Sequence, residues 1–186
     1  MRKVTVVVLT LLFLFTFITG VTAEEPIKIG ALFALTGGLA PYGPPIVNGA
    51  KLAVQQINEI GGVLGRKLEL VIRDTGTAPA MGRDAASKLI NLDKVAAIIG
   101  ALGSSVTVAS SSITIPAGIV LISPSSTSPM LTDLEDNDFV FRTCPSDALQ
   151  GVIQARLAIN LGYKTCLLFT SPSPRDLSTS RMPSSA

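Results

Sequence analysis

A regular alternation of short apolar runs and helical segments is the feature that most constrains this chain. Each apolar run is followed, after a short turn, by a segment whose apolar residues repeat at intervals typical of a helix. Strands that alternate with helices through short loops favour a parallel sheet with helices on both faces. We therefore predict an α/β fold. The predicted strands cover residues 27–33, 68–72, 95–99, 119–122 and 139–143, and the predicted helices cover 45–60, 81–92, 104–114 and 146–161.

The alternation restarts after Thr143, with a helix and then a strand over residues 164–169, which indicates entry into a second lobe. The pattern then stops, because residues 171–186 contain three Pro and six Ser and no hydrophobic period. We expect this segment to be either disordered or non-native, since it resembles translated sequencing-adapter DNA joined to a truncated reading frame. The predicted organisation is a ligand-binding lobe over 24–143, the start of a second lobe over 144–170, and the tail 171–186.

The N-terminus has the features of a secretory signal peptide. Arg2 and Lys3 precede an apolar stretch of 15 residues, Val4–Ile18, and small residues follow it. A membrane-spanning helix needs about 20 apolar residues, so the alternative of a membrane anchor is weaker. We predict that residues 1–23 are removed by cleavage after Ala23 and that the mature protein is free in the periplasm.

Charge and composition exclude several classes of function. Residues 24–170 contain 11 Lys and Arg and 12 Asp and Glu, a net charge of −1, so nucleic acid is not an expected partner. The sequence contains no His, which removes Ser–His relays and most zinc sites. Nucleotide-binding glycine motifs are also missing. We expect a protein with no catalytic residues, cofactor or metal, and an exported α/β enzyme is the alternative.

Two further features have more than one interpretation. The acidic residues within 133–138 do not follow a calcium-loop pattern, so a solvated loop is favoured over a metal site. Cys144 and Cys166 would be permitted to pair in an exported protein. We expect two unpaired thiols, with Cys166 a small residue of the core.

A Gly-Ser-Ser turn follows the strand predicted over 95–99, and its serines open the next helix. The first N–H groups of a helix have no internal partner and carry partial positive charge. Ser104 and Ser105 therefore mark a candidate site for a carboxylate. The alternative is that a serine only caps its own helix.

A second Ser-rich segment, with Ser125, Ser126 and Thr127, follows the strand predicted over 119–122. Small residues leave carbonyl and hydroxyl oxygens accessible, and an ammonium group needs such acceptors. Ligands of open α/β sheets bind beyond the carboxyl ends of strands, where both Ser-rich segments are predicted to lie. A plain Ser/Pro-rich turn is the alternative.

Tyr42 follows the first predicted strand and is one of two Tyr in the chain. It could form a wall beside an apolar ligand side chain, with its hydroxyl at the rim. A half-buried Tyr on a loop is the alternative.

Together these segments resemble the branched-chain amino-acid-binding proteins of ABC import systems, which have the type I periplasmic-binding fold. The resemblance covers about residues 27–170 and depends on the order and spacing of short motifs, none of which is specific alone. The motifs are Ile27-Lys28-Ile29-Gly30, Tyr42-Gly43, Asn48-Gly49-Ala50, Ile57-Asn58, Gly61-Gly62, Ile98-Ile99-Gly100, Gly103-Ser104-Ser105, Ile122-Ser123-Pro124 with Thr127, and Phe141-Arg142-Thr143.

The resemblance implies two similar lobes, joined by crossing strands, that close on an amino acid. It implies that Ser104 binds the ligand carboxylate and that Thr127 contacts both the ammonium and the carboxylate. It also implies backbone contacts at Ser125 and Ser126, and a side-chain pocket lined by Tyr42.

The resemblance also implies what this chain lacks. Some relatives carry a disulfide from the loop near Thr77 to the turn near Gly103, and neither position is Cys here. Relatives are longer and have a full second lobe, which supplies an acidic residue for the ammonium group. We therefore expect the 186-residue chain to be marginally stable and to bind weakly or not at all.

The function implied is that of an extracytoplasmic solute-binding protein, expected to be monomeric. It would deliver a small-molecule amino acid, with an aliphatic branched side chain, to a membrane ABC permease complex. The alternatives are a carrier of amides, urea or aromatic acids, and a ligand-sensing ectodomain of the same fold.

Overall fold

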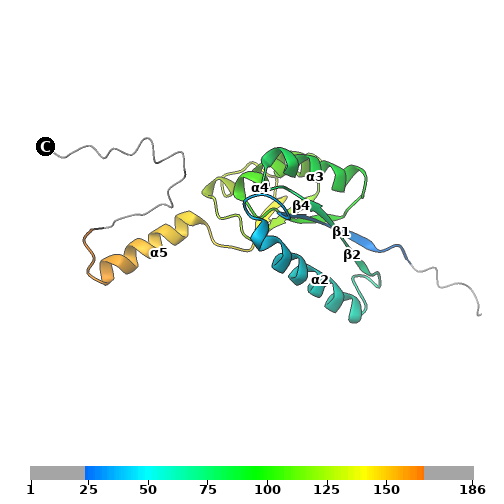
Figure 1. Cartoon of the computed structure of the whole chain (residues 1–186), viewed down its shortest axis with the longest axis horizontal. Coiled ribbons are helices and arrows are strands. Elements are labelled where there is room, and N and C mark those ends of the chain that lie inside the picture. The colour runs from blue at the N-terminus through cyan, green and yellow to red at the C-terminus, as the bar shows by residue number, and fades with distance from the viewer. Residues whose placement is uncertain (1–23, 166–186) are drawn as a thin grey trace, which may run out of the picture. The chain divides into compact units, whose positions relative to one another are not determined.

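The computed structural model describes residues 24–165, in which strands and helices alternate (Figure 1). The strand predicted over 164–169 lies mostly outside this range. The strands are β1 (Ile27–Phe33), β2 (Leu68–Asp74), β3 (Ala97–Gly100), β4 (Val120–Ser123) and β5 (Val140–Arg142). The α-helices are α2 (Gly43–Glu59), α3 (Pro79–Asn91), α4 (Ser104–Thr114) and α5 (Asp147–Asn160), and the 3-10 helices are η1 (Ala40–Tyr42) and η2 (Pro129–Leu131).

The strands form one sheet in the order β2-β1-β3-β4-β5, and every neighbouring pair is parallel. This arrangement confirms the predicted α/β fold. The chain passes from β1 to β2 on one side and returns to β3 on the other side of β1. The carboxyl ends of β1 and β3 therefore form the topological switch point, where open α/β sheets bind their ligands.

Helices pack on both faces of the sheet, as predicted (Figure 1). Successive residues of a strand point to opposite faces, and β1 supplies residues to two apolar clusters, one on each face of the sheet. Leu32 belongs to the cluster shared with α3 and α4, which includes Leu89 and Val106. Phe33 belongs to the second cluster, against which Ile46 of α2 packs. Both Leu32 and Phe33 are fully buried.

Some element boundaries differ from the prediction for local reasons. Strand β2 runs two residues past Ile72, because Arg73 and Asp74 continue the pairing with β1. Helix α3 begins at Pro79, before the predicted start at residue 81, because proline suits the first turn of a helix. The hydrophobic pattern predicted neither extension, because the added residues of β2 and α3 are polar or small.

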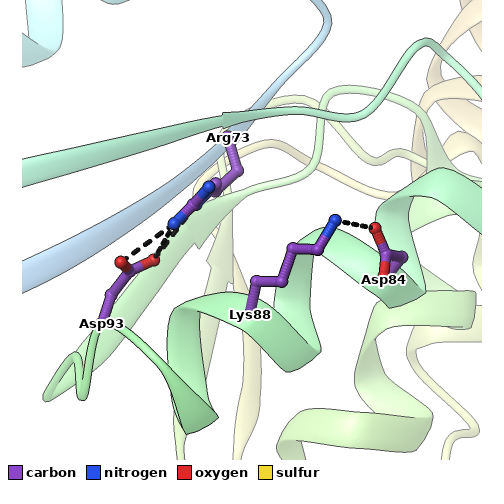
Figure 2. Close-up of polar contacts among 4 residues, drawn as sticks. All are labelled: Arg73, Asp84, Lys88 and Asp93. Carbon is purple, nitrogen blue, oxygen red and sulfur yellow. Dashed lines mark hydrogen bonds and ion pairs between the residues drawn. The ribbon is translucent and has the colours of Figure 1, made fainter.

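Two ion pairs lie beside the edge strand β2 (Figure 2). The guanidinium of Arg73 donates to both carboxylate oxygens of Asp93, with Nη2–Oδ2 at 2.8 Å, and so ties β2 to the segment after α3. Lys88 and Asp84 form a 2.6 Å pair one helical turn apart on α3. The second pair is exposed, and such pairs stabilise a protein by only about 0.3–0.5 kcal/mol.

The chain divides into two compact units after Ser146. In the second unit α5 contains no buried residue, and its apolar side chains Leu149, Val152, Ile153 and Leu157 are exposed. No helix within residues 24–165 is long and apolar enough to cross a membrane. Cys144 is partly exposed, whereas Cys166 lies outside the described residues, so the prediction of two unpaired thiols stays a prediction.

Candidate functional site

The two Ser-rich segments lie at the ends of neighbouring strands, because Ile99 of β3 pairs with Ile122 of β4. The turn after β3 starts at Gly100, whose φ of 132° is open to glycine rather than to L side chains. A Cβ at this position would also lie 2.4 Å from the carbonyl oxygen of Leu32. Gly100 thus lets the chain turn tightly at the switch point, and the Gly100–Ala101 peptide is cis.

Several hydrogen bonds join these two segments across the sheet end, including one from the Ser126 hydroxyl to the carbonyl of Ala101 at 3.3 Å. The hydroxyl of Ser123 donates to the carbonyl of Ala101 at 2.7 Å, and the hydroxyl of Ser125 donates to the carbonyl of Leu102 at 2.9 Å. The backbone N–H of Ser128 donates to the Ser104 hydroxyl oxygen at 3.2 Å. The structure therefore brings together two segments that are about 20 residues apart in the chain.

A buried pair of hydroxyls lies beneath this junction. The Oγ1 of Thr107 and the Oγ of Ser126 are 2.7 Å apart, and both residues are fully buried. Thr107 also accepts a hydrogen bond from the backbone N–H of Ala101 at 3.1 Å. The backbone N–H of Ser126 donates to the Ser123 hydroxyl at 3.0 Å. Thr107 and Ser126 therefore support the two segments from inside the protein.

The serines at the start of α4 do not cap this helix, which was the alternative interpretation of the sequence. Gly103 is the N-cap residue, and no side chain caps the helix. The N–H groups of Val106 and Thr107 donate to the carbonyl of Gly103, so those of Ser104 and Ser105 precede the first helical hydrogen bond. The Ser104 side chain instead contacts the neighbouring segment through Ser128.

This geometry suits a carboxylate. A hydroxyl has one proton to donate and two lone pairs that accept. Because the Ser104 oxygen accepts from Ser128, its own proton can be donated to an anion placed before α4. The helix N-terminus attracts the same charge. Ser104 is partly exposed and Ser105 is exposed, so a solute can reach both.

Arg142 of β5 holds the outer side of the second segment. Its guanidinium donates to the carbonyl of Ser128 at 2.8 Å and to that of Thr127 at 3.3 Å. It also donates to the hydroxyl of Thr132. Arg142 belongs to one of the sequence motifs, but the sequence did not predict its role. Its main partners are backbone carbonyl groups, which every residue carries, so the residue types at 127 and 128 do not reveal the contact.

Tyr42 occupies the β1 side of the switch point, at the end of η1. The residue is 62% exposed, so it is more exposed than the half-buried Tyr that the alternative interpretation predicts. The backbone N–H of Tyr42 donates to the carbonyl of Leu39 at 3.1 Å. Tyr42 thus follows one strand of the switch point, whereas Ser104 follows the other.

Two pockets lie elsewhere in the described part of the chain. A pocket of about 220 Å³ lies near the amino ends of the strands and includes Lys28 and Lys94, and one of about 240 Å³ lies beside Asp74 and Lys88. Neither includes a candidate ligand-binding residue. Within residues 24–165 no group of three His, Cys, Asp or Glu side chains could hold a metal ion. The carboxylate of Asp136 instead accepts the backbone N–H groups of Asp138 in its own loop and of Val140 at the start of β5.

A parallel sheet of this strand order, with hydroxyl groups and a helix N-terminus at the switch point, is the arrangement in which open α/β folds hold their ligands. The chain belongs to the periplasmic binding protein family, whose sequence profile matches residues 26–179. This confirms the resemblance noted in the motifs. The match extends into the segment predicted as a tail. Membership implies an extracytoplasmic protein, and the family is not one of enzymes.

Similar proteins from three bacteria carry informative names. The Leu/Ile/Val-binding protein BraC3 of Rhizobium johnstonii is 34% identical over 137 residues, which are 74% of this chain and 37% of BraC3. The branched-chain amino acid transporter substrate-binding protein LivJ of Streptococcus pneumoniae, solved with isoleucine, is 36% identical with a TM-score of 0.67. That match covers 74% of this chain and 39% of LivJ.

A third protein, the solute-binding protein of an ABC transporter from Rhodopseudomonas palustris, was solved with 3,4-dihydroxy benzoic acid. It is 26% identical with a TM-score of 0.67, and the match covers 74% of this chain and 37% of that one. The chain therefore spans less than two fifths of the length of these relatives.

Proposed function

We propose that this chain is part of an extracytoplasmic solute-binding protein that carries an amino acid, with an aliphatic branched side chain, to a membrane ABC permease. Residues 24–143 form the first ligand-binding lobe and residues 144–170 begin the second. Residues 1–23 act as a signal peptide cleaved after Ala23. The mature protein works in the periplasm as a monomer, without a cofactor and without catalysis.

The observation that carries this proposal is the hydrogen bond from Ser128 N–H to Ser104 Oγ, which leaves the Ser104 proton for a carboxylate. Fixed N–H groups at the start of α4 add to the attraction. Ser105 contributes from the same turn, and Ser125 and Thr127 border the site from the second segment. Ser126 is fully buried, and its backbone N–H is bonded to the Ser123 hydroxyl, so it supports the second segment from inside the protein.

The aliphatic specificity draws its support from relatives. BraC3 is named for Leu, Ile and Val, and LivJ was solved with isoleucine. Tyr42 provides an aromatic surface at the switch point for an apolar side chain. Pockets of this kind distinguish one methylene by about 10- to 200-fold, so several aliphatic amino acids are expected to bind.

The test is isothermal titration calorimetry on the full-length protein. L-leucine, L-isoleucine and L-valine are titrated beside leucinamide, which lacks the carboxylate, and N-acetylleucine, which lacks the ammonium group. We expect the free amino acids to bind and both derivatives to bind about 10- to 150-fold more weakly, since each loses a charged hydrogen-bond partner.

A second ligand class is included because the Rhodopseudomonas palustris relative was solved with an aromatic acid. Binding of 3,4-dihydroxybenzoate without binding of any aliphatic amino acid would replace the proposed ligand by an aromatic acid. Equal binding of leucine and leucinamide would contradict the role of Ser104 and the helix N-terminus.

A further inference from the structure

The loop between β1 and α2 is held at the end of β2 by one carboxylate. The Oδ1 of Asp74 accepts the backbone N–H groups of Leu35 at 2.9 Å, Thr36 at 3.2 Å and Gly76 at 2.9 Å. Its Oδ2 accepts the Thr36 hydroxyl at 2.6 Å. Four hydrogen bonds thus converge on this side chain, and three of them come from a loop about 38 residues earlier in the chain.

Thr77 adds a second attachment three residues later. Its Oγ1 accepts the backbone N–H of Leu39 at 3.0 Å and donates to the carbonyl of Thr36 at 3.1 Å. Thr77 has a φ of 58°, which is unusual for a β-branched residue and is maintained where surrounding contacts compensate for the strain. The loop backbones approach so closely that a Cβ on Gly37 would lie 2.2 Å from the carbonyl oxygen of Gly76.

This clamp, defined as Asp74 and Thr77 with their bonds to the loop, is connected to the candidate site through Leu39. The N–H of Leu39 donates to Thr77, and its carbonyl accepts the N–H of Tyr42. The Leu39 side chain packs against the apolar cluster that contains Leu102, and its Cδ1 lies 3.5 Å from the Cβ position of Gly103. The clamped loop therefore contacts the turn before α4.

We propose that Asp74 and Thr77 are positioning residues that fix Tyr42 relative to the start of α4 and thereby set which aliphatic side chains the site accepts. They act through the loop and make no contact with the solute. This proposal rests on the proposed function. The specificity role follows from how the wall of the pocket packs against the ligand. Discrimination between side chains that differ by one methylene depends on how closely that wall approaches them.

Asp74→Asn removes the negative charge of the clamp and the acceptor oxygen that binds the Thr36 hydroxyl, and Thr77→Val removes the second hydroxyl, both with little change of shape. Thr77→Ser keeps the hydroxyl and serves as the conservative rescue. Asp93→Asn is the matched control, because it removes a carboxylate that pairs with Arg73 beside the same strand and has no bond to the loop. Each full-length variant is studied by amide hydrogen exchange over residues 35–42 and by calorimetry with leucine and valine.

We expect Asp74→Asn and Thr77→Val to accelerate exchange in residues 35–42 by about tenfold or more. The ratio of leucine to valine affinity changes by about three- to tenfold in the same variants. Thr77→Ser and Asp93→Asn keep both the wild-type exchange and the wild-type affinity ratio. A purely structural role would weaken both ligands equally and leave the ratio unchanged.

Three results overturn the proposal. The first is unchanged exchange in both clamp variants. The second is faster exchange with an unchanged affinity ratio, and the third is an equal effect of Asp93→Asn. Failure of the wild-type protein to bind any amino acid would overturn the proposed function and the specificity role together. The exchange data would then still decide whether the clamp holds the loop.

Discussion

The Ser104 hydroxyl oxygen lies 3.2 Å from the backbone nitrogen of Ser128, a residue 24 positions further along the chain. This contact joins the start of α4 to the segment after β4. It also orients the serine, since a hydroxyl that accepts from one side donates on another. The contact holds both segments in place, and in the proposed function this order would lower the entropy lost when a solute binds.

The Ser104→Ala variant tests the role of that hydroxyl. It removes a hydrogen bond to a charged ligand group, and such bonds contribute about 1.5–3 kcal/mol. We expect amino-acid affinity to fall by about 10- to 150-fold in calorimetry on the full-length protein. Ser112→Ala is the control, because Ser112 is an exposed serine of the same helix whose hydroxyl donates to the carbonyl of Ala109 within α4. An equal loss in both variants would count against the site.

Two buried threonines of α4 are expected to respond in opposite ways to substitution by valine. Thr107→Val leaves the buried N–H of Ala101 and the hydroxyl of Ser126 without this partner. We expect it to lower the free energy of unfolding by about 1–3 kcal/mol, measured by urea denaturation.

Thr114→Val is the matched comparison. Within residues 24–165 the Thr114 hydroxyl is fully buried and has no hydrogen-bond partner. Replacing an unsatisfied hydroxyl by a methyl group removes a desolvation penalty, so we expect no loss or a gain of up to about 1 kcal/mol. A destabilisation equal to that of Thr107→Val would contradict the distinction.

The stability of the protein at acid pH should depend on Asp74. Burial by itself raises the pKa of this carboxyl, but the hydrogen bonds from the Thr36 side chain and from the backbone N–H groups of Gly76, Leu35 and Thr36 outweigh burial. The pKa therefore lies below its ordinary value of 3.8. The resulting stabilisation is fully present above the pKa of the unfolded chain and is lost as the pH falls through the folded pKa.

Removing the carboxyl tests this linkage. Between about pH 5 and pH 2 we expect the free energy of unfolding to fall less steeply for Asp74→Asn than for wild type, while the two curves run parallel above pH 5. Identical slopes below pH 4 would show that Asp74 titrates alike in the folded and unfolded chains.

Two helical glycines should differ when replaced by alanine. A Cβ on Gly82 would lie 2.4 Å from Cγ1 of Val106 and 3.1 Å from Oγ of Ser110, where α3 packs on α4. We expect Gly82→Ala to destabilise the protein, because overpacking costs about 1–3 kcal/mol and exceeds the helical gain. A Cβ on Gly49 of α2 would meet no atom within 4 Å, so Gly49→Ala should stabilise by about 0.5–1 kcal/mol. Thermal unfolding separates the two.

The order of strands and helices could be predicted from local pattern alone. The apolar run Ile27–Phe33 is typical of a buried strand, and the spacing of Ala85 and Leu89 is typical of a helix. Residues that are close in sequence are therefore enough to predict each element. The same holds for the turn at Ser104, where serines after a strand indicate a helix start. The candidate carboxylate site was therefore visible in the sequence as a motif.

Contacts between distant segments were decided by the tertiary structure. Thr107, Arg142 and Asp74 each bind backbone groups of another loop, and a backbone N–H or carbonyl is the same whatever residue bears it. No pattern of residue types could reveal those partners. The sequence by itself determined which strands and helices form and where hydroxyls gather. Only the folded sheet, by fixing which strand ends are neighbours, decided that Ser104 meets Ser128 and that Asp74 holds the loop leading to Tyr42.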